Sequence, residues 1–246
     1  MFRRLVRLSR TLLKGKLLFL ANNIADAKYF EFKLGMPVPE LKVIRPLGLT
    51  DYYGYPGDLP KPDPNVLAAQ WHKTHIYGYL REEEGINMSM IPFGHHYGGP
   101  HNLLQFKGFV DIPYQYSTMK FYENVAAGVP LLMPSARFVM ELGQSGLHQM
   151  PIFSPHILHV FSPNSSQVTV YDLEWARYVD YYSPEFEPFV YFFDNYSELR
   201  RLSLLPRDEM DSKHVRVKGP AFYIEFRREL YRMWEEVLLA GYSYWG

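Results

Sequence analysis

Two hydroxyl side chains, a lysine and a glutamate lie close together near the middle of the chain, as Ser117, Thr118, Lys120 and Glu123. Hydroxyl and ammonium groups donate hydrogen bonds that suit the oxygens of a phosphate. A glutamate one helical turn further along can accept hydrogen bonds from the hydroxyls of a ribose or another sugar. The spacing therefore indicates a site for a phosphorylated sugar. The alternative is a surface helix whose lysine and glutamate are simply exposed.

The elements that would position these side chains are a helix and the buried strand after it. Ser117 or Thr118 can cap the helix, because either hydroxyl can accept a hydrogen bond from an otherwise unpaired backbone N–H group. Gly128 suits the left-handed residue that follows a last helical turn, and Pro130 prevents the helix from continuing. The apolar run from 129 to 133 is typical of a strand that is buried on both faces.

Lys120 is unusual because the positive end of the helix dipole opposes a cation in the first turn, at a cost of about 0.3–1 kcal/mol. No acidic residue lies between Ser117 and Phe121 to compensate for it. A bound phosphate would turn this cost into a gain, since the N–H groups, the hydroxyls and the lysine would all face negative charge.

The same segment resembles a signature of the GT-B glycosyltransferases of the broad group 1 type. The resemblance rests on Lys120, Glu123, Ala126, Ala127, Gly128, Val129 and Pro130. In that family the signature belongs to the C-terminal, donor-binding domain. The resemblance implies that Ser117, Thr118 and Lys120 bind the diphosphate of a nucleotide sugar and that Glu123 binds its ribose. It also implies an electrostatic mechanism that requires no metal.

Other segments are similar to this family in the same order along the chain. Residues 104–110 resemble the strand before the signature helix, and residues 42–49 resemble the passage from the N-terminal to the C-terminal domain. The family's proline before the lysine is absent here, and Gln115 stands where many members have a second glutamate. Gln115, Gly98 and Gly99 are candidates for a loop beside the pocket, although the two glycines also suit a simple turn.

Composition restricts the classes of protein and site that the chain can represent. A formal net charge of zero argues against nucleic acid as the main partner. The absence of cysteine excludes disulfides, thiolate metal sites and a cysteine nucleophile. Five histidines between positions 72 and 101 could form a metal site, but their spacing matches no standard ligand set, so we expect no metal. A membrane span requires about 18 consecutive apolar residues, and no apolar run in the sequence is that long.

The order of apolar runs and helical patterns predicts an α/β protein with a Rossmann-like parallel sheet flanked by helices. Residues 1–50 are expected to be a remnant of an N-terminal Rossmann-like domain, and residues 51–246 a donor-binding α/β domain with a C-terminal helix. The expected helices cover 24–34, 66–71, 136–142, 196–204 and 220–239, and the expected strands cover 17–21, 42–45, 74–80, 104–110, 129–133, 157–161, 168–171 and 189–193. Asp194 is expected to cap the helix that begins near Tyr196.

These observations lead to the hypothesis of a cytoplasmic glycosyltransferase that uses a nucleotide-sugar donor, an unknown acceptor and no cofactor. A second hypothesis is a non-catalytic subunit that binds the nucleotide sugar and depends on a partner chain for the N-terminal half. A third is a structural domain in which the signature only packs. The basic segment at positions 1–16 reads as a helix, with a targeting peptide as the alternative.

Overall fold

The computed structural model of the protein describes residues 6–7, 18–48, 61–70, 76–92, 95, 97–147 and 173–242. Nearly all of the basic N-terminal segment lies outside these ranges, as do the expected strands at 157–161 and 168–171.

Among the described residues, the main sheet contains five parallel strands in the spatial order β4-β3-β5-β6-β7. Its strands are β3 (Leu67–Gln70), β4 (Met88–Ile91), β5 (Phe109–Val110), β6 (Leu131–Pro134) and β7 (Val190–Phe193). The order of the strands reverses at β3, because β4 pairs with one of its edges and β5 with the other. In open parallel sheets, ligands bind beyond the carboxyl ends of the strands at such a reversal point.

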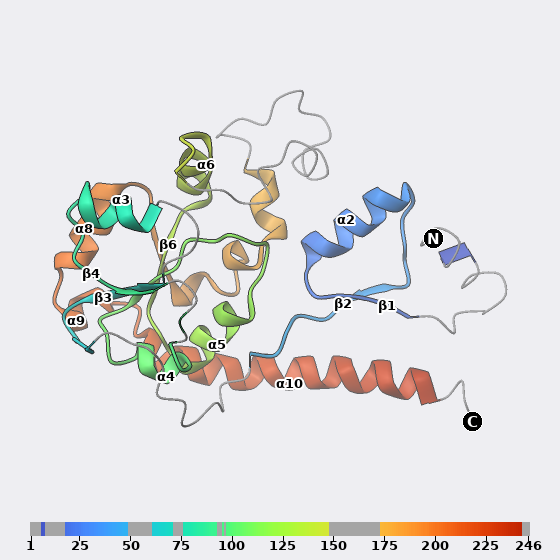
Figure 1. The fold of residues 1–246 in the computed structure, drawn as a ribbon. Coiled ribbons are helices and arrows are strands. Elements are labelled where there is room, and N and C mark those ends of the chain that lie inside the picture. Colours follow the sequence, from blue (N-terminus) through green and yellow to red (C-terminus); the bar gives the residue numbers. More distant parts are fainter. Residues whose placement is uncertain are drawn as a thin grey trace.

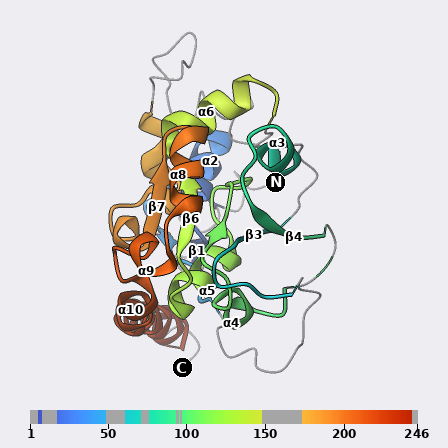
Figure 2. The same ribbon diagram turned by 90° about the vertical axis from the view of Figure 1, so that its left-hand side faces the viewer.

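Helices alternate with these strands, so the predicted α/β class with a Rossmann-like parallel sheet is confirmed. The helices of this part are α3 (Ile76–Glu82), α4 (Pro100–Leu103), α5 (Met119–Ala127), α6 (Ala136–Gln144), α8 (Tyr196–Leu204) and α9 (Arg207–Met210). Between residues 173 and 189 the structure describes three short 3-10 helices, namely η2 (Glu174–Tyr178), η3 (Asp180–Tyr182) and η4 (Glu187–Phe189). Figure 2 shows the same sheet and helices from the side.

A smaller unit precedes the main sheet and consists of β1 (Phe19–Ala21), α2 (Ile24–Leu34) and β2 (Leu41–Val43). The two strands pair in parallel, with Phe19 opposite Leu41. The helix has the bounds that the sequence predicts, because Asn23 caps its start and Gly35, at a φ of 64°, ends it in the left-handed conformation. Phe32 of α2 is 51% exposed, and the strands are only partly covered.

The C-terminal helix α10 (Val215–Tyr242) extends from the main sheet to the smaller unit (Figure 1). It crosses α5 so closely at Gly219 that a Cβ atom there would lie 2.5 Å from the carbonyl oxygen of Val125. Further along, Lys42 forms an ion pair with Glu236 of α10 at 3.9 Å. The helix is longer than predicted and includes Pro220 within its first turns.

Two elements before β4 differ from the prediction. The segment predicted as a helix at 66–71 contains strand β3, and most of the segment predicted as a strand at 74–80 belongs to helix α3. Short apolar runs do not distinguish a buried strand from a buried helix, and β3 contains two alanines that favour helix locally. Strand β4 lies in a stretch for which the sequence analysis expected no regular element. Within the described ranges, no helix combines the length and apolar character that crossing a membrane requires.

Candidate functional site

The signature segment forms the expected helix, α5, with caps at both ends. Thr118 has an extended backbone at φ −137°, and its Oγ1 accepts a hydrogen bond from the N–H group of Phe121 at 3.3 Å. Gly128, at a φ of 75°, ends the helix and is followed by the buried strand β6. The N–H groups of Met119 and Lys120 lie in the first turn, where a helix offers them no acceptor of its own.

A cavity of about 510 Å³ lies in front of this first turn. The cavity extends from the start of α5 to the start of α2, so that the segments that follow β5 and β1 both contribute to its lining. It is lined by Asn22, Asn23, Asp26, Pro46, Tyr114, Gln115, Tyr116, Ser117, Thr118, Met119 and Lys120. Its size falls within the range of about 300–1,000 Å³ that is usual for small-molecule sites.

Four of the residues that the sequence singles out therefore line one cavity, namely Gln115, Ser117, Thr118 and Lys120. Glu123 is not among the lining residues. It lies one turn further along α5, where it is half-buried and where burial raises the pKa of its carboxyl group. Gly98 and Gly99 do not line the cavity either, because they form the turn that precedes α4.

Lys120 has an acidic partner that the local sequence does not reveal. Its Nζ lies 2.6 Å from Oδ1 of Asp111, and both side chains are largely buried. The ammonium also lies 5.1 Å from the centre of the Phe109 ring and 6.0 Å from that of Tyr114. Asp111 directly follows β5, so the ion pair sits at the carboxyl end of the central strand. A carboxylate at the end of a buried apolar strand was the signal that could have identified it.

The hydroxyl of Ser117 is turned away from the cavity. Its Oγ is buried beside Tyr122 and Asp180, and it forms no hydrogen bond of good geometry with the described residues. Tyr122 donates a hydrogen bond to Asp180 at 2.5 Å, and Arg45 pairs with the same carboxyl group at 3.3 Å. Burial raises the pKa of Asp180, while these neighbours oppose the rise. Ser117 can therefore offer a ligand its backbone rather than its hydroxyl.

The hydroxyl of Thr118 keeps a proton that it can donate. Its Oγ1 accepts the hydrogen bond from Phe121 and a second one from the hydroxyl of Tyr181, at 3.1 Å. These two bonds use the acceptor capacity of the oxygen and leave its own proton available for donation. Tyr181 belongs to η3, so this hydrogen bond connects the 3-10 helix to the start of α5.

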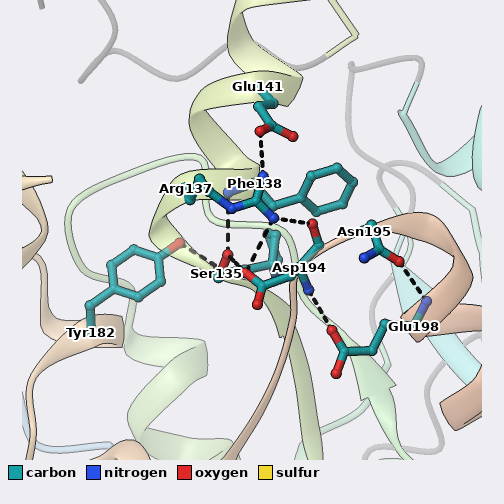
Figure 3. A network of polar contacts seen from close by, with 9 residues as sticks. Ser135, Arg137, Phe138, Glu141, Tyr182, Asp194, Asn195 and Glu198 are labelled. Carbon is teal, nitrogen blue, oxygen red and sulfur yellow. Dashed lines mark hydrogen bonds and ion pairs between the residues drawn. The ribbon is translucent and has the colours of Figure 1, made fainter. Parts of the chain in front are cut away.

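A second polar network occupies the same edge of the sheet, at the ends of β6 and β7 (Figure 3). Ser135 accepts a hydrogen bond from the N–H group of Phe138 and donates a short one to Asp194. Arg137 donates to the carbonyl oxygen of Asp194 at 2.6 Å. These polar groups form hydrogen bonds with one another, so the network caps α6 and connects it to the end of β7.

The predicted role of Asp194 as a helix cap is wrong. Asn195 caps α8, since its Oδ1 accepts a hydrogen bond from the N–H group of Glu198 at 2.8 Å (Figure 3). Asp194 instead serves the network around Ser135, because it precedes the cap and points toward α6.

Of the five clustered histidines, the structure describes only His95 and His101, and His72, His75 and His96 lie outside the described residues. In the part of the chain that is described, no three His, Asp or Glu side chains come together as a group that could hold a metal ion.

The fold and the cavity define a Rossmann-like α/β protein with a candidate small-molecule site at the start of α5. Comparison of the chain with protein-family models, with curated proteins and with solved structures finds no match.

Proposed function

We propose that the protein is a glycosyltransferase that binds a nucleotide-sugar donor in the cavity before α5 and transfers the glycosyl group to an acceptor. The observation that carries this proposal is the cavity itself. The residues that resemble the diphosphate-binding part of the GT-B signature, Ser117, Thr118 and Lys120, line it together with the first turn of α5.

The chemistry that these groups support is stabilisation of a diphosphate. The N–H groups of Met119 and Lys120, the Thr118 hydroxyl and the positive end of the helix dipole would face the phosphate oxygens. Lys120 would share its charge between Asp111 and the phosphate, because its Nζ already contacts Asp111. Groups arranged in this way favour the departure of a nucleoside diphosphate from the sugar.

Ribose binding by Glu123 requires the donor to reach beyond the cavity, because Glu123 is not among its lining residues. A nucleoside would have to extend along α5 to reach it. The backbone of Gly48 packs against the turn of α5 that contains Glu123. A Cβ atom added to Gly48 would lie 2.6 Å from the backbone nitrogen of Glu123. The Glu123→Ala variant tests this role, because it should weaken binding of UDP or GDP more than binding of pyrophosphate.

A second candidate is a non-catalytic subunit that binds the donor and receives the acceptor-binding half from a partner chain. The observation that favours it is the small size of the first unit, in which the described residues form a sheet of two strands. Leu18, Leu20 and Phe32 of this unit are each at least 40% exposed. A partner that extends this sheet would cover apolar surface of this kind.

Calorimetric titration of the protein with pyrophosphate, UDP, UDP-glucose, GDP and GDP-mannose tests the proposal. We expect the wild-type protein to bind at least one of these compounds. Lys120→Ala should weaken that binding about tenfold or more, because a hydrogen bond to a charged group is lost. Asp111→Asn is combined with Lys120→Ala in a second variant, so that no unpaired carboxylate remains buried. Turnover of a bound donor supports the enzyme, and binding without turnover supports the subunit. If none of these compounds binds, the proposal is wrong.

A further inference from the structure

The wall of the cavity opposite α5 has a different chemical character from the start of α5. It consists of Asn22, Asn23 and Asp26, which follow β1 and begin α2. Asp26 is the acidic residue among the cavity-lining residues, and Lys120 is the basic one. The cavity therefore has a basic end at α5 and an acidic end at α2.

Asp26 takes part in a reciprocal cap of α2 that leaves part of its carboxylate unused. Its N–H group donates to Oδ1 of Asn23 at 2.7 Å, and Asn23 Nδ2 donates to its Oδ2 at 2.9 Å. Among the residues that the structure describes, Oδ1 of Asp26 accepts no hydrogen bond and the carboxylate forms no ion pair. The cap thus accounts for one oxygen only, and the other remains for a ligand in the cavity.

The surroundings of Asp26 favour a neutral hydrogen-bond donor over an anion. The neighbouring groups that interact with its charge are the hydroxyl of Tyr116 and the carboxyl group of Asp180. Neither of them supplies positive charge. A second anionic group placed at this end of the cavity would meet a carboxylate that pairs with no cation among the residues the structure describes.

We propose that Asp26 selects the group attached to the diphosphate, accepting a hydroxyl-rich neutral group such as a sugar ring and repelling a further phosphate. This inference rests on the proposed binding of a diphosphate at α5. Hydroxyls of the sugar donate to Oδ1 of Asp26, and the amide of Asn22 offers both a donor and an acceptor beside it. The repulsion of a third phosphate supplies specificity against nucleoside triphosphates, which are otherwise similar ligands.

The test compares UDP-glucose with UTP, and GDP-mannose with GTP, in calorimetric titrations of the wild-type protein and Asp26→Asn. Asparagine has the same shape and can keep the cap with Asn23, so the fold is expected to persist. In the variant, affinity for the triphosphate should rise and affinity for the nucleotide sugar should fall. The ratio of the two dissociation constants should change about tenfold or more. A merely structural role of Asp26 would change both affinities in the same direction.

Glu31→Gln is the matched control, because it removes one negative charge from α2 at a residue that does not line the cavity. Glutamine can keep the hydrogen bond that Glu31 accepts from the N–H group of Val38. The control should leave the ratio within about twofold of the wild-type value. An unchanged ratio in Asp26→Asn, with binding that still depends on Lys120, overturns this inference alone. If the wild-type protein binds neither these ligands nor pyrophosphate, the proposed function and this inference are both wrong.

Discussion

Lys120 and Asp111 form a largely buried ion pair, with 2.6 Å between Nζ and Oδ1, at the carboxyl end of the central strand. The carboxylate compensates for the unfavourable position of a lysine in the first turn of α5. It also means that Lys120 is already neutralised when the cavity contains no anion. A bound phosphate would therefore compete with Asp111 for the ammonium group.

Removal of Asp111 should destabilise the protein strongly. Asp111→Ala leaves the Lys120 ammonium buried without a partner, which should lower the free energy of unfolding by about 3–5 kcal/mol. Urea denaturation measures this change. Addition of Lys120→Met to the variant should restore part of the loss, because no buried charge remains. The control Glu141→Ala removes a half-exposed pair with Arg137 and should cost less than about 1 kcal/mol. Equal losses in Asp111→Ala and Glu141→Ala would contradict the interpretation.

Thr118 and Ser135 cap neighbouring helices on the same edge of the sheet and provide a matched pair of variants. Thr118→Ala and Ser135→Ala should each lower the free energy of unfolding by about 1 kcal/mol, because each removes an N-cap. Only Thr118 lines the cavity, so only its replacement should also weaken binding of pyrophosphate in calorimetry. Loss of binding in Ser135→Ala as well would place the anion site elsewhere.

The carboxyl group of Glu123 should lower the free energy of unfolding as the pH rises. Burial raises the pKa of its carboxyl group in the folded state, so the folded protein keeps a proton that the unfolded chain has lost. The free energy of unfolding should therefore fall from about pH 4 upward until the pH passes the raised pKa. Glu123→Gln has no such proton to lose. The difference in stability between wild type and variant, measured by urea unfolding from about pH 4 to 7, should shift in favour of the variant and become constant once the pH has passed the raised pKa. A difference that is constant with pH would disprove the assignment.

Alanine variants at Gly128 and Gly85 separate the stability cost of backbone strain from the cost of close packing. Both have a positive φ, of 75° and 63° respectively. A Cβ atom at Gly128 would lie 2.8 Å from the carbonyl oxygen of Arg216, whereas one at Gly85 would meet no atom within 4 Å. Gly85→Ala should cost about 1–2 kcal/mol from the left-handed conformation alone. Gly128→Ala should cost a further 1–3 kcal/mol, roughly, because α10 must move away from α5. Thermal unfolding of the two variants checks the difference, and a loss in Gly85→Ala equal to that in Gly128→Ala would contradict it.

The errors around β3 show where local patterns fail. The sequence Leu67–Gln70 contains two alanines, which favour a helix, yet it forms the strand at which the strand order reverses. The following helix α3 contains a glycine and two tyrosines, which favour other conformations. Neighbouring strands and burial outweigh these local preferences, and no pattern within so short a segment contains that information.

Local signals in the sequence are enough to predict some of the helix ends. The bounds of α2 and α8 and the caps of α5 follow from side chains within a few residues of each helix end. Other features depend on the whole fold, namely the partner of Lys120, the burial of the Ser117 hydroxyl and the cavity that Asp26 shares with the start of α5. They depend on how β1, β5 and η3 are brought together, because contacts between segments far apart in the chain are selected by packing of the whole core.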